Sequence, residues 1–184
     1  MDRRSLLIGS ITMIGAGGLT GCAGGFGEIA EDRPSRAVPV DTTHAQILVN
    51  AYRADHGLPA LRLDQRLNQA AQDMAFILAR LGTMKTREHS ARRLAARLDE
   101  QGYDALAAAE NIGAGYSSLE AAMVGWKGSS DHDKNLKNTF VTRFGVARAD
   151  SEGGTWTTFW AMIFALPRED YRSGVTLGGA VWRP

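Results

Sequence analysis

The sequence has very little cysteine: Cys22 is the only one among its 184 residues. A single cysteine cannot form a disulfide within the chain, so the folded part must be held together by its core alone. The composition also lacks an excess of charge of either sign, with 21 Lys and Arg against 20 Asp and Glu. A nearly neutral chain has no long-range attraction for nucleic acid, and we expect no nucleic-acid partner.

The sequence also lacks an apolar run long enough to cross a membrane as a helix. Its most apolar segment, Leu6 to Leu19, spans about 14 residues, whereas a membrane-spanning helix needs about 20. Arg3 and Arg4 precede this segment, an order typical of a signal peptide. We therefore expect residues 1–21 to be removed during export, with both the general and the twin-arginine route open.

Cys22 directly follows this segment, in the order Leu19-Thr20-Gly21-Cys22. This order resembles a lipobox, in which small residues precede a cysteine that receives a diacylglycerol group. We predict lipidation at Cys22, which would anchor the protein to a membrane of a bacterial cell envelope, with its domain on the periplasmic or extracellular face. Ala23 stands where an aspartate often retains such lipoproteins at the inner membrane, which favours the outer membrane if the cell has one.

The rest of the chain divides into three parts. Residues 22–41 carry the lipidated cysteine and combine glycine, proline and charge with few large apolar residues, which predicts a flexible tether. Residues 42–166 are predicted to form one domain, and residues 167–184 a tail without clear periodicity.

Five helices are expected in this domain, from apolar residues at three-to-four spacing and from capping residues. They begin near Thr42, Asp64, Ser90, Ser117 and Ser129. The fourth is expected to open with a capping box formed by its serine and the glutamate three residues later.

The third of these helices is expected to carry its charge outward. Leu94 and Leu98 face inward, whereas Arg92, Arg93 and Arg97 are expected to point to solvent. We favour a solvated helix face for these arginines, with contact to anionic lipid as the alternative.

The hydrophobic period changes in the C-terminal third. From Thr155 to Leu166 apolar side chains occur at both the odd-numbered and the even-numbered positions, which face opposite sides of a strand. This strand must therefore be covered on both faces. Residues 143–149 predict a second strand, joined to the first through Gly153-Gly154 as an antiparallel hairpin. Helices on both sides of a small central antiparallel sheet form an α/β/α sandwich, within the α+β class.

Three polar residues stand out as candidates for chemistry: His89, Glu110 and His132. Glu110 lies in a stretch otherwise suited to a buried strand. Because a buried carboxylate without a partner is costly, Glu110 is expected to face a histidine, an arginine, a metal ion or a water-filled cleft. His132 falls in the first turn of a helix, where the dipole keeps the ring neutral and suited to metal binding.

The order of these residues within short motifs resembles the CAP superfamily, the cysteine-rich secretory and pathogenesis-related group, and within it the bacterial SCP-like branch. The motifs are His89-Ser90, Ala109-Glu110-Asn111-Ile112, Trp126-Lys127-Gly128-Ser129 with His132, and Asn135-Leu136. The resemblance covers roughly residues 43–165 and implies an α/β/α sandwich around a central antiparallel sheet.

The resemblance also implies a cleft. In this family two histidines and two acidic residues commonly meet in a central cleft that sometimes holds a divalent metal ion. By position His89, Glu110 and His132 match three of the four, which makes them the candidate ligands for zinc. Ser129 takes the place of the fourth acid, as it often does in the bacterial branch.

Two neighbouring acids offer a substitute for that fourth carboxylate. Asp131 and Asp133 lie in the first turn of the same expected helix as His132. Acidic side chains at this position also stabilise the helix dipole, and we favour that role for both.

Three functions remain open. The first is a non-catalytic module that binds a lipid, a cell-wall fragment or another envelope partner in the His/Glu cleft. The second is a zinc-dependent hydrolase that uses His89, Glu110 and His132. The third is a purely structural envelope protein. We favour the first, because no Gly-x-Ser-x-Gly nucleophile motif is present and the only cysteine is expected to be lipidated.

Overall fold

The computed structural model describes residues 32–174, 176–177 and 180–181. The predicted signal peptide, residues 1–21, and the predicted lipidation site at Cys22 lie outside this part of the chain. Among the described residues, no helix has both the length and the apolar character needed to cross a membrane.

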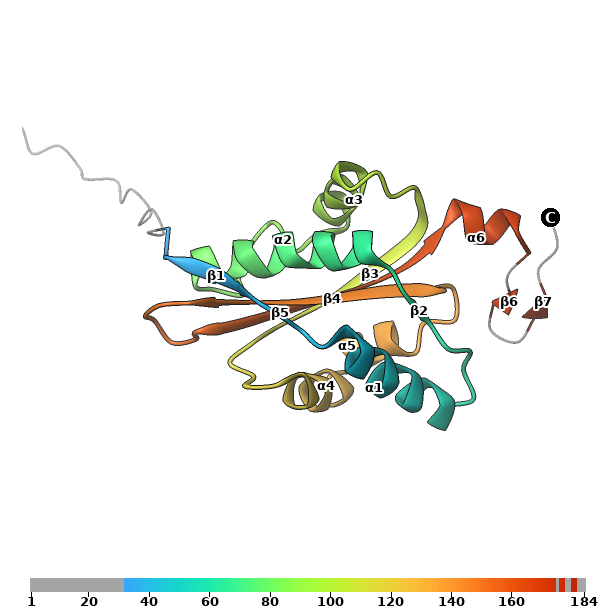
Figure 1. Cartoon of the computed structure of the whole chain (residues 1–184), viewed down its shortest axis with the longest axis horizontal. Helices are drawn as coiled ribbons and strands as arrows, with labels where there is room; N and C mark the ends of the chain where they lie inside the picture. The colour runs from blue at the N-terminus through green and yellow to red at the C-terminus, as the bar shows by residue number, and fades with distance from the viewer. Residues whose placement is uncertain (1–31, 175, 178–179, 182–184) are drawn as a thin grey trace, which may run out of the picture.

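A five-stranded sheet forms the centre of the fold and is seen nearly edge-on in Figure 1. Four strands follow the order β1-β4-β5-β3, and β2 pairs with β4 outside this path. The pairings are antiparallel, except that β2 runs parallel to β4. The strands are β1 Ser35–Val38, β2 Arg62–Leu63, β3 Ala105–Ala114, β4 Arg143–Ser151 and β5 Thr158–Pro167.

Helices cover both faces of this sheet (Figure 1). α2 (Gln65–Leu81) and α3 (Ala91–Glu100) lie on one face. α1 (Thr42–Asp55), α4 (Leu119–Lys127) and α5 (Ser130–Leu136) lie on the other. The predicted α/β/α sandwich with a small, mainly antiparallel sheet is confirmed.

The central strand β5 contributes to both apolar cores, as predicted from the apolar residues on both of its faces. Phe159 and Ile163 pack in the core beneath α2 and α3. Trp160, Met162 and Phe164 point the other way and pack in the core shared with α1, α4 and α5. Because successive residues of a strand face opposite sides, one short segment supplies both layers.

Helix α2 crosses β4 at very close range. A Cβ atom added to Gly145 would lie 2.3 Å from the backbone nitrogen of Asn68 and 2.3 Å from the carbonyl carbon of Leu67. Only glycine permits this approach, because any other residue would push the helix off the sheet.

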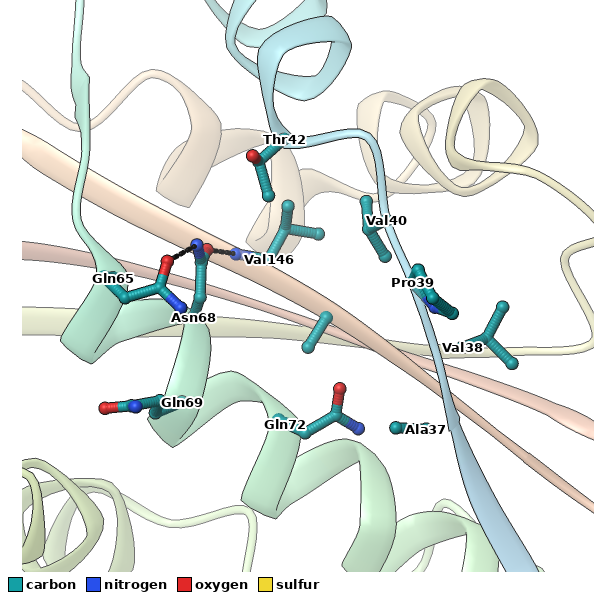
Figure 2. Close-up of a pocket in the computed structure, with 11 residues that line it drawn as sticks. Ala37, Val38, Pro39, Val40, Thr42, Gln65, Asn68, Gln69, Gln72 and Val146 are labelled. Atoms are coloured by element: carbon teal, nitrogen blue, oxygen red, sulfur yellow. Dashed lines mark hydrogen bonds between the residues drawn. The ribbon is translucent and has the colours of Figure 1, made fainter.

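Side-chain amides of α2 complete the edge of β4 where no strand covers it. β2 pairs with the start of β4 and β1 with its end, so among the described residues Val146 has no strand partner on this edge. Instead, the Val146 N–H donates to Asn68 Oδ1 at 2.9 Å, and at Arg148, where β1 pairs with β4, Gln72 Nε2 donates to the carbonyl at 3.1 Å. Figure 2 shows Asn68 reaching from α2 toward Val146 in a pocket of about 340 Å³.

Two boundaries of the domain differ from the expectation. The predicted tether ends earlier, because Ser35–Val38 pairs with β4 as β1. The predicted tail begins with a helix, α6 (Arg168–Arg172), and continues with the short pair β6 (Thr176–Leu177) and β7 (Ala180–Val181). Backbone pairing with β4 positions β1, and an ion pair holds α6. Neither segment has the apolar periodicity from which the other elements were predicted.

Two of the expected helix caps are also displaced by one residue. Asp41, rather than Thr42, caps α1 by accepting the His44 N–H. Ser118, rather than Ser117, caps α4 by accepting the Ala121 N–H. The cap is the residue whose side chain reaches a free N–H of the first turn.

A buried ionic network ties α6 to the body of the domain. Arg143 on β4 donates to Asp170 at 2.6 and 3.1 Å and to Asp64 at 2.9 Å. Thr142 and Arg62 also donate to Asp170. Burial raises the pKa of Asp170, but the hydrogen bonds from Arg143, Thr142 and Arg62 outweigh it and lower the pKa to about 2.

This network predicts a stability difference that depends on pH. A carboxylate whose pKa is lowered by folding contributes stability above the pKa of the unfolded group, and that contribution is lost as the pH falls toward the folded value. Asp170→Asn should therefore be less stable than the wild type by about 2 kcal/mol at pH 7, and the gap should close near pH 2. Urea unfolding between pH 7 and 2 measures this difference in the free energy of unfolding, and Asp55→Asn, at an exposed position, is the control. A gap that stays constant with pH would contradict this assignment.

Candidate functional site

Glu110 is buried in β3 and holds two partners. Its carboxylate is only 3% exposed, with His89 Nδ1 at 3.0 Å from Oε2 and Arg97 Nη2 at 2.7 Å from Oε1. Because Glu110 accepts from the permanently charged guanidinium, His89 donates its Nδ1 proton and leaves Nε2 as the free ring atom. The expectation that Glu110 faces a histidine or an arginine is confirmed, since it faces both.

Arg97 was expected to point to solvent, and that expectation is wrong. Its side chain is 6% exposed and turns from α3 toward Glu110. On the helical wheel Arg97 lies three residues after Leu94, so it shares the inward side of that leucine. The signal was present in the spacing, but the neighbouring exposed arginines obscured it.

Arg97 also fixes the loop that carries His89. Its Nη1 donates to the Glu88 carbonyl at 3.0 Å, while Nη2 donates to the Glu110 carboxylate. One guanidinium thus orients both the carboxylate and the residue next to His89. Its Nε is buried without a hydrogen-bond partner among the described residues.

A second set of bonds joins β3 to α5. Asn111 is fully buried and donates Nδ2 to the His132 carbonyl at 3.0 Å. Its Oδ1 accepts from Asn135 Nδ2 at 2.9 Å, and the same amide lies 3.4 Å from the Glu110 carbonyl. Glu110 and Asn111 point to opposite faces of β3, so one contacts α3 and the other contacts α5.

The ring of His132 is held neutral. Burial lowers its pKa, and the electrostatic interaction with His89 lowers it further, against a smaller opposing effect of Asp131. The two imidazoles are therefore within electrostatic range of each other, and His132 is uncharged at neutral pH.

The other acid candidates do not reach Glu110. Ser129 is the N-terminal cap residue of α5, and no hydrogen bond links it to Glu110 in the described part of the chain. Asp133 points toward α1, where it accepts from the Tyr52 hydroxyl and pairs with Lys137. Asp131 is exposed in the first turn of α5.

These residues do not fit a zinc ion. Among the described residues, no group of three His, Cys, Asp or Glu side chains is placed to hold a metal. Both oxygens of Glu110 already accept hydrogen bonds, and the Arg97 guanidinium places a permanent positive charge beside them. His132 lies on α5, within electrostatic range of His89, but it does not form a metal-holding group with His89 and Glu110. Catalytic zinc needs three protein ligands, and this arrangement leaves at most two histidine nitrogens.

A pocket of about 280 Å³ opens beside this group, lined by the start of α3, the outer strand β3 and Asn135 of α5. Its polar side consists of His89, Glu110, Ser90 and Asn135. Its apolar side includes Leu94 and three alanines of α3 and β3. His89, with a side chain 37% exposed, is the residue of the charged group that a ligand can reach.

The comparisons with known proteins identify the family. The profile of the CAP, or cysteine-rich secretory protein, family matches residues 46–164. This chain therefore belongs to the CAP family, as the motif order predicted. A search of curated protein sequences finds no significant match.

Solved structures show the same fold in bacterial proteins. An extracellular protein with an SCP domain from Bacillus anthracis is 28% identical, with a TM-score of 0.57, over 67% of this chain and 39% of that protein. An outer surface protein from Borrelia burgdorferi is 17% identical, with a TM-score of 0.59, over 73% of this chain and 99% of that one. A cysteine-rich secretory protein from Staphylococcus aureus is 20% identical, with a TM-score of 0.50, over 69% of this chain and 40% of that protein.

Proposed function

We propose that this protein is a cell-envelope lipoprotein whose CAP domain is a non-catalytic binding module, with the ligand seated in the pocket beside His89. The state of the Glu110 carboxylate carries the proposal. Its two oxygens accept hydrogen bonds from His89 and Arg97, and the positive charge of the Arg97 guanidinium beside them disfavours a role as general base or metal ligand. This arrangement favours the binding module over the zinc-hydrolase alternative.

The pocket favours a ligand with a polar end and an apolar body. His89 Nε2, Ser90 and Asn135 offer hydrogen bonds at one side, whereas Leu94 and the alanines offer an apolar wall. The pocket volume of about 280 Å³ is close to roughly 300 Å³, the lower end of the volumes of small-molecule binding sites. A lipid head group with the start of its chain, or a small cell-wall fragment, has this chemistry.

The proposed location rests on the neighbours and on the N-terminal sequence. The Bacillus anthracis protein is extracellular, and the Borrelia burgdorferi protein lies on the outer surface. We place this protein in the cell envelope, tethered by a lipid on Cys22. Fatty-acid labelling that is lost in Cys22→Ser would support the anchor, and labelling that persists would contradict it.

Native mass spectrometry tests the binding role. The purified protein is incubated with lipid vesicles in one arm and with soluble cell-wall fragments in the other. We expect a bound mass on the wild type in one arm and at least a tenfold loss of it in His89→Ala. His56→Ala, an exposed histidine at the end of α1, is the matched control and should bind like the wild type. Equal binding by the wild type and His89→Ala, or binding by neither, would contradict the proposal.

A further inference from the structure

A second hollow lies where the β4–β5 hairpin meets the end of β3. It has a volume of about 520 Å³ and is lined by residues 114–117 and 155–158. None of these residues is charged, although 22% of the chain is Asp, Glu, Lys or Arg. The hollow shares no lining residue with the pocket beside His89.

An exposed tryptophan forms one wall of this hollow. Trp156 is 38% exposed, whereas Trp126 and Trp160 are buried and donate their indole N–H groups to carbonyl oxygens. The Trp156 N–H has no such partner within the described residues. Unlike Trp126 and Trp160, Trp156 therefore leaves part of its ring and its indole N–H available to a ligand.

The backbone is shaped to support this indole. Gly115 has a φ of +80°, a conformation that glycine adopts readily. A Cβ atom at this position would lie 3.0 Å from Trp156 Cδ1. The absence of a side chain at Gly115 therefore lets the Trp156 ring lie directly against the end of β3.

Free hydroxyl groups surround the tryptophan. Ser117, Thr155 and Thr157 are exposed, and in the described part of the chain their hydroxyls make no hydrogen bond to protein. Thr158, by contrast, already donates to the Tyr116 carbonyl at 3.1 Å. Three hydroxyls and one indole N–H thus remain available around one aromatic face.

We propose that this hollow binds an uncharged glycan. The C–H face of a sugar ring packs on the electron-rich face of an indole, and sugar hydroxyls exchange hydrogen bonds with serine and threonine. The lack of charged side chains removes the attraction that a phosphate or carboxylate ligand would need. The site goes beyond the binding role of the pocket beside His89 and does not depend on it.

Calorimetric titration of the full chain in detergent with an uncharged tetrasaccharide of N-acetylglucosamine tests this site. We expect saturable binding by the wild type, a loss of at least tenfold in Trp156→Ala, and recovery to within about threefold in Trp156→Phe, which keeps an aromatic face. Thr155→Val combined with Thr157→Val should also weaken binding. Phe140→Ala is the matched control, because Phe140 is an exposed aromatic residue (66%) outside the hollow.

Three results would overturn the proposal. They are no binding by the wild type, equal binding by the wild type and Trp156→Ala, or saturable binding of a proline-rich peptide in place of the sugar. Thermal melts of each variant accompany the titrations. A loss of binding is attributed to the substituted side chain only where the melting temperature is unchanged. The outcome of the His89→Ala experiment does not affect sugar binding at Trp156. The failure of one proposal can therefore be distinguished from the failure of the other.

Discussion

Trp160→Ala should destabilise the domain by about 3–5 kcal/mol, a large part of the 5–15 kcal/mol that a domain of this size usually has. Trp160 is 3% exposed on the central strand β5 and packs in the core shared with α1, α4 and α5. Truncation removes apolar contacts, leaves a cavity, and removes the hydrogen bond from Trp160 Nε1 to the Tyr116 carbonyl at 2.8 Å. Urea unfolding measures the loss.

Trp156→Ala is the control for this substitution, since it removes the same atoms from an exposed position. We expect it to change the free energy of unfolding by less than about 1 kcal/mol. Equal effects of the two substitutions would show that β5 is not covered by helices on the face that carries Trp160. The packing of both helical layers on one strand would then be wrong.

Arg97→Met should have the second large effect, about 3–5 kcal/mol, because it leaves the Glu110 carboxylate buried without its cationic partner. Methionine keeps the length and apolar stem of arginine, so the loss reports on the charge and its hydrogen bonds. The substitution also frees the Glu88 carbonyl and so loosens the loop that carries His89. Thermal and urea unfolding measure the effect.

Arg92→Met is the matched control on the same helix. Arg92 is exposed, and substitutions at such positions usually change stability by less than about 0.5 kcal/mol. If Arg97→Met proves as harmless as Arg92→Met, the buried position of Arg97 would be contradicted.

The sequence was most informative about the layers of the fold. Apolar residues on both parities of the last long strand predicted a sheet covered on both sides, and β5 confirms it. The same reasoning missed β1, because Ser35–Val38 is ordered by pairing with β4 far along the chain. Such long-range pairing leaves no local period in a short polar segment. The small tail helix α6 was missed for a similar reason, since an ion pair to Asp170 holds it.

The candidate site was predicted in part. The cost of burying a carboxylate correctly required a partner for Glu110, and the motif order placed His89 beside it. Arg97 was missed because charge alone does not distinguish an inward from an outward arginine on a helix rich in them. The spacing of the histidines also could not reveal that, among the described residues, His132 forms no metal-holding group with His89 and Glu110.

A double-mutant cycle between Arg97 and Glu110, measured by urea unfolding in EDTA and in Zn²⁺, tests the central claim that Arg97 neutralises Glu110 in place of a metal ion. The claim predicts that Arg97→Met and Glu110→Gln are not additive, with a coupling of about 1–3 kcal/mol, and that the double variant recovers much of the stability lost in Arg97→Met. The coupling should be the same in both solutions. Additive single effects, or a wild type that Zn²⁺ stabilises only while Glu110 is present, would contradict it.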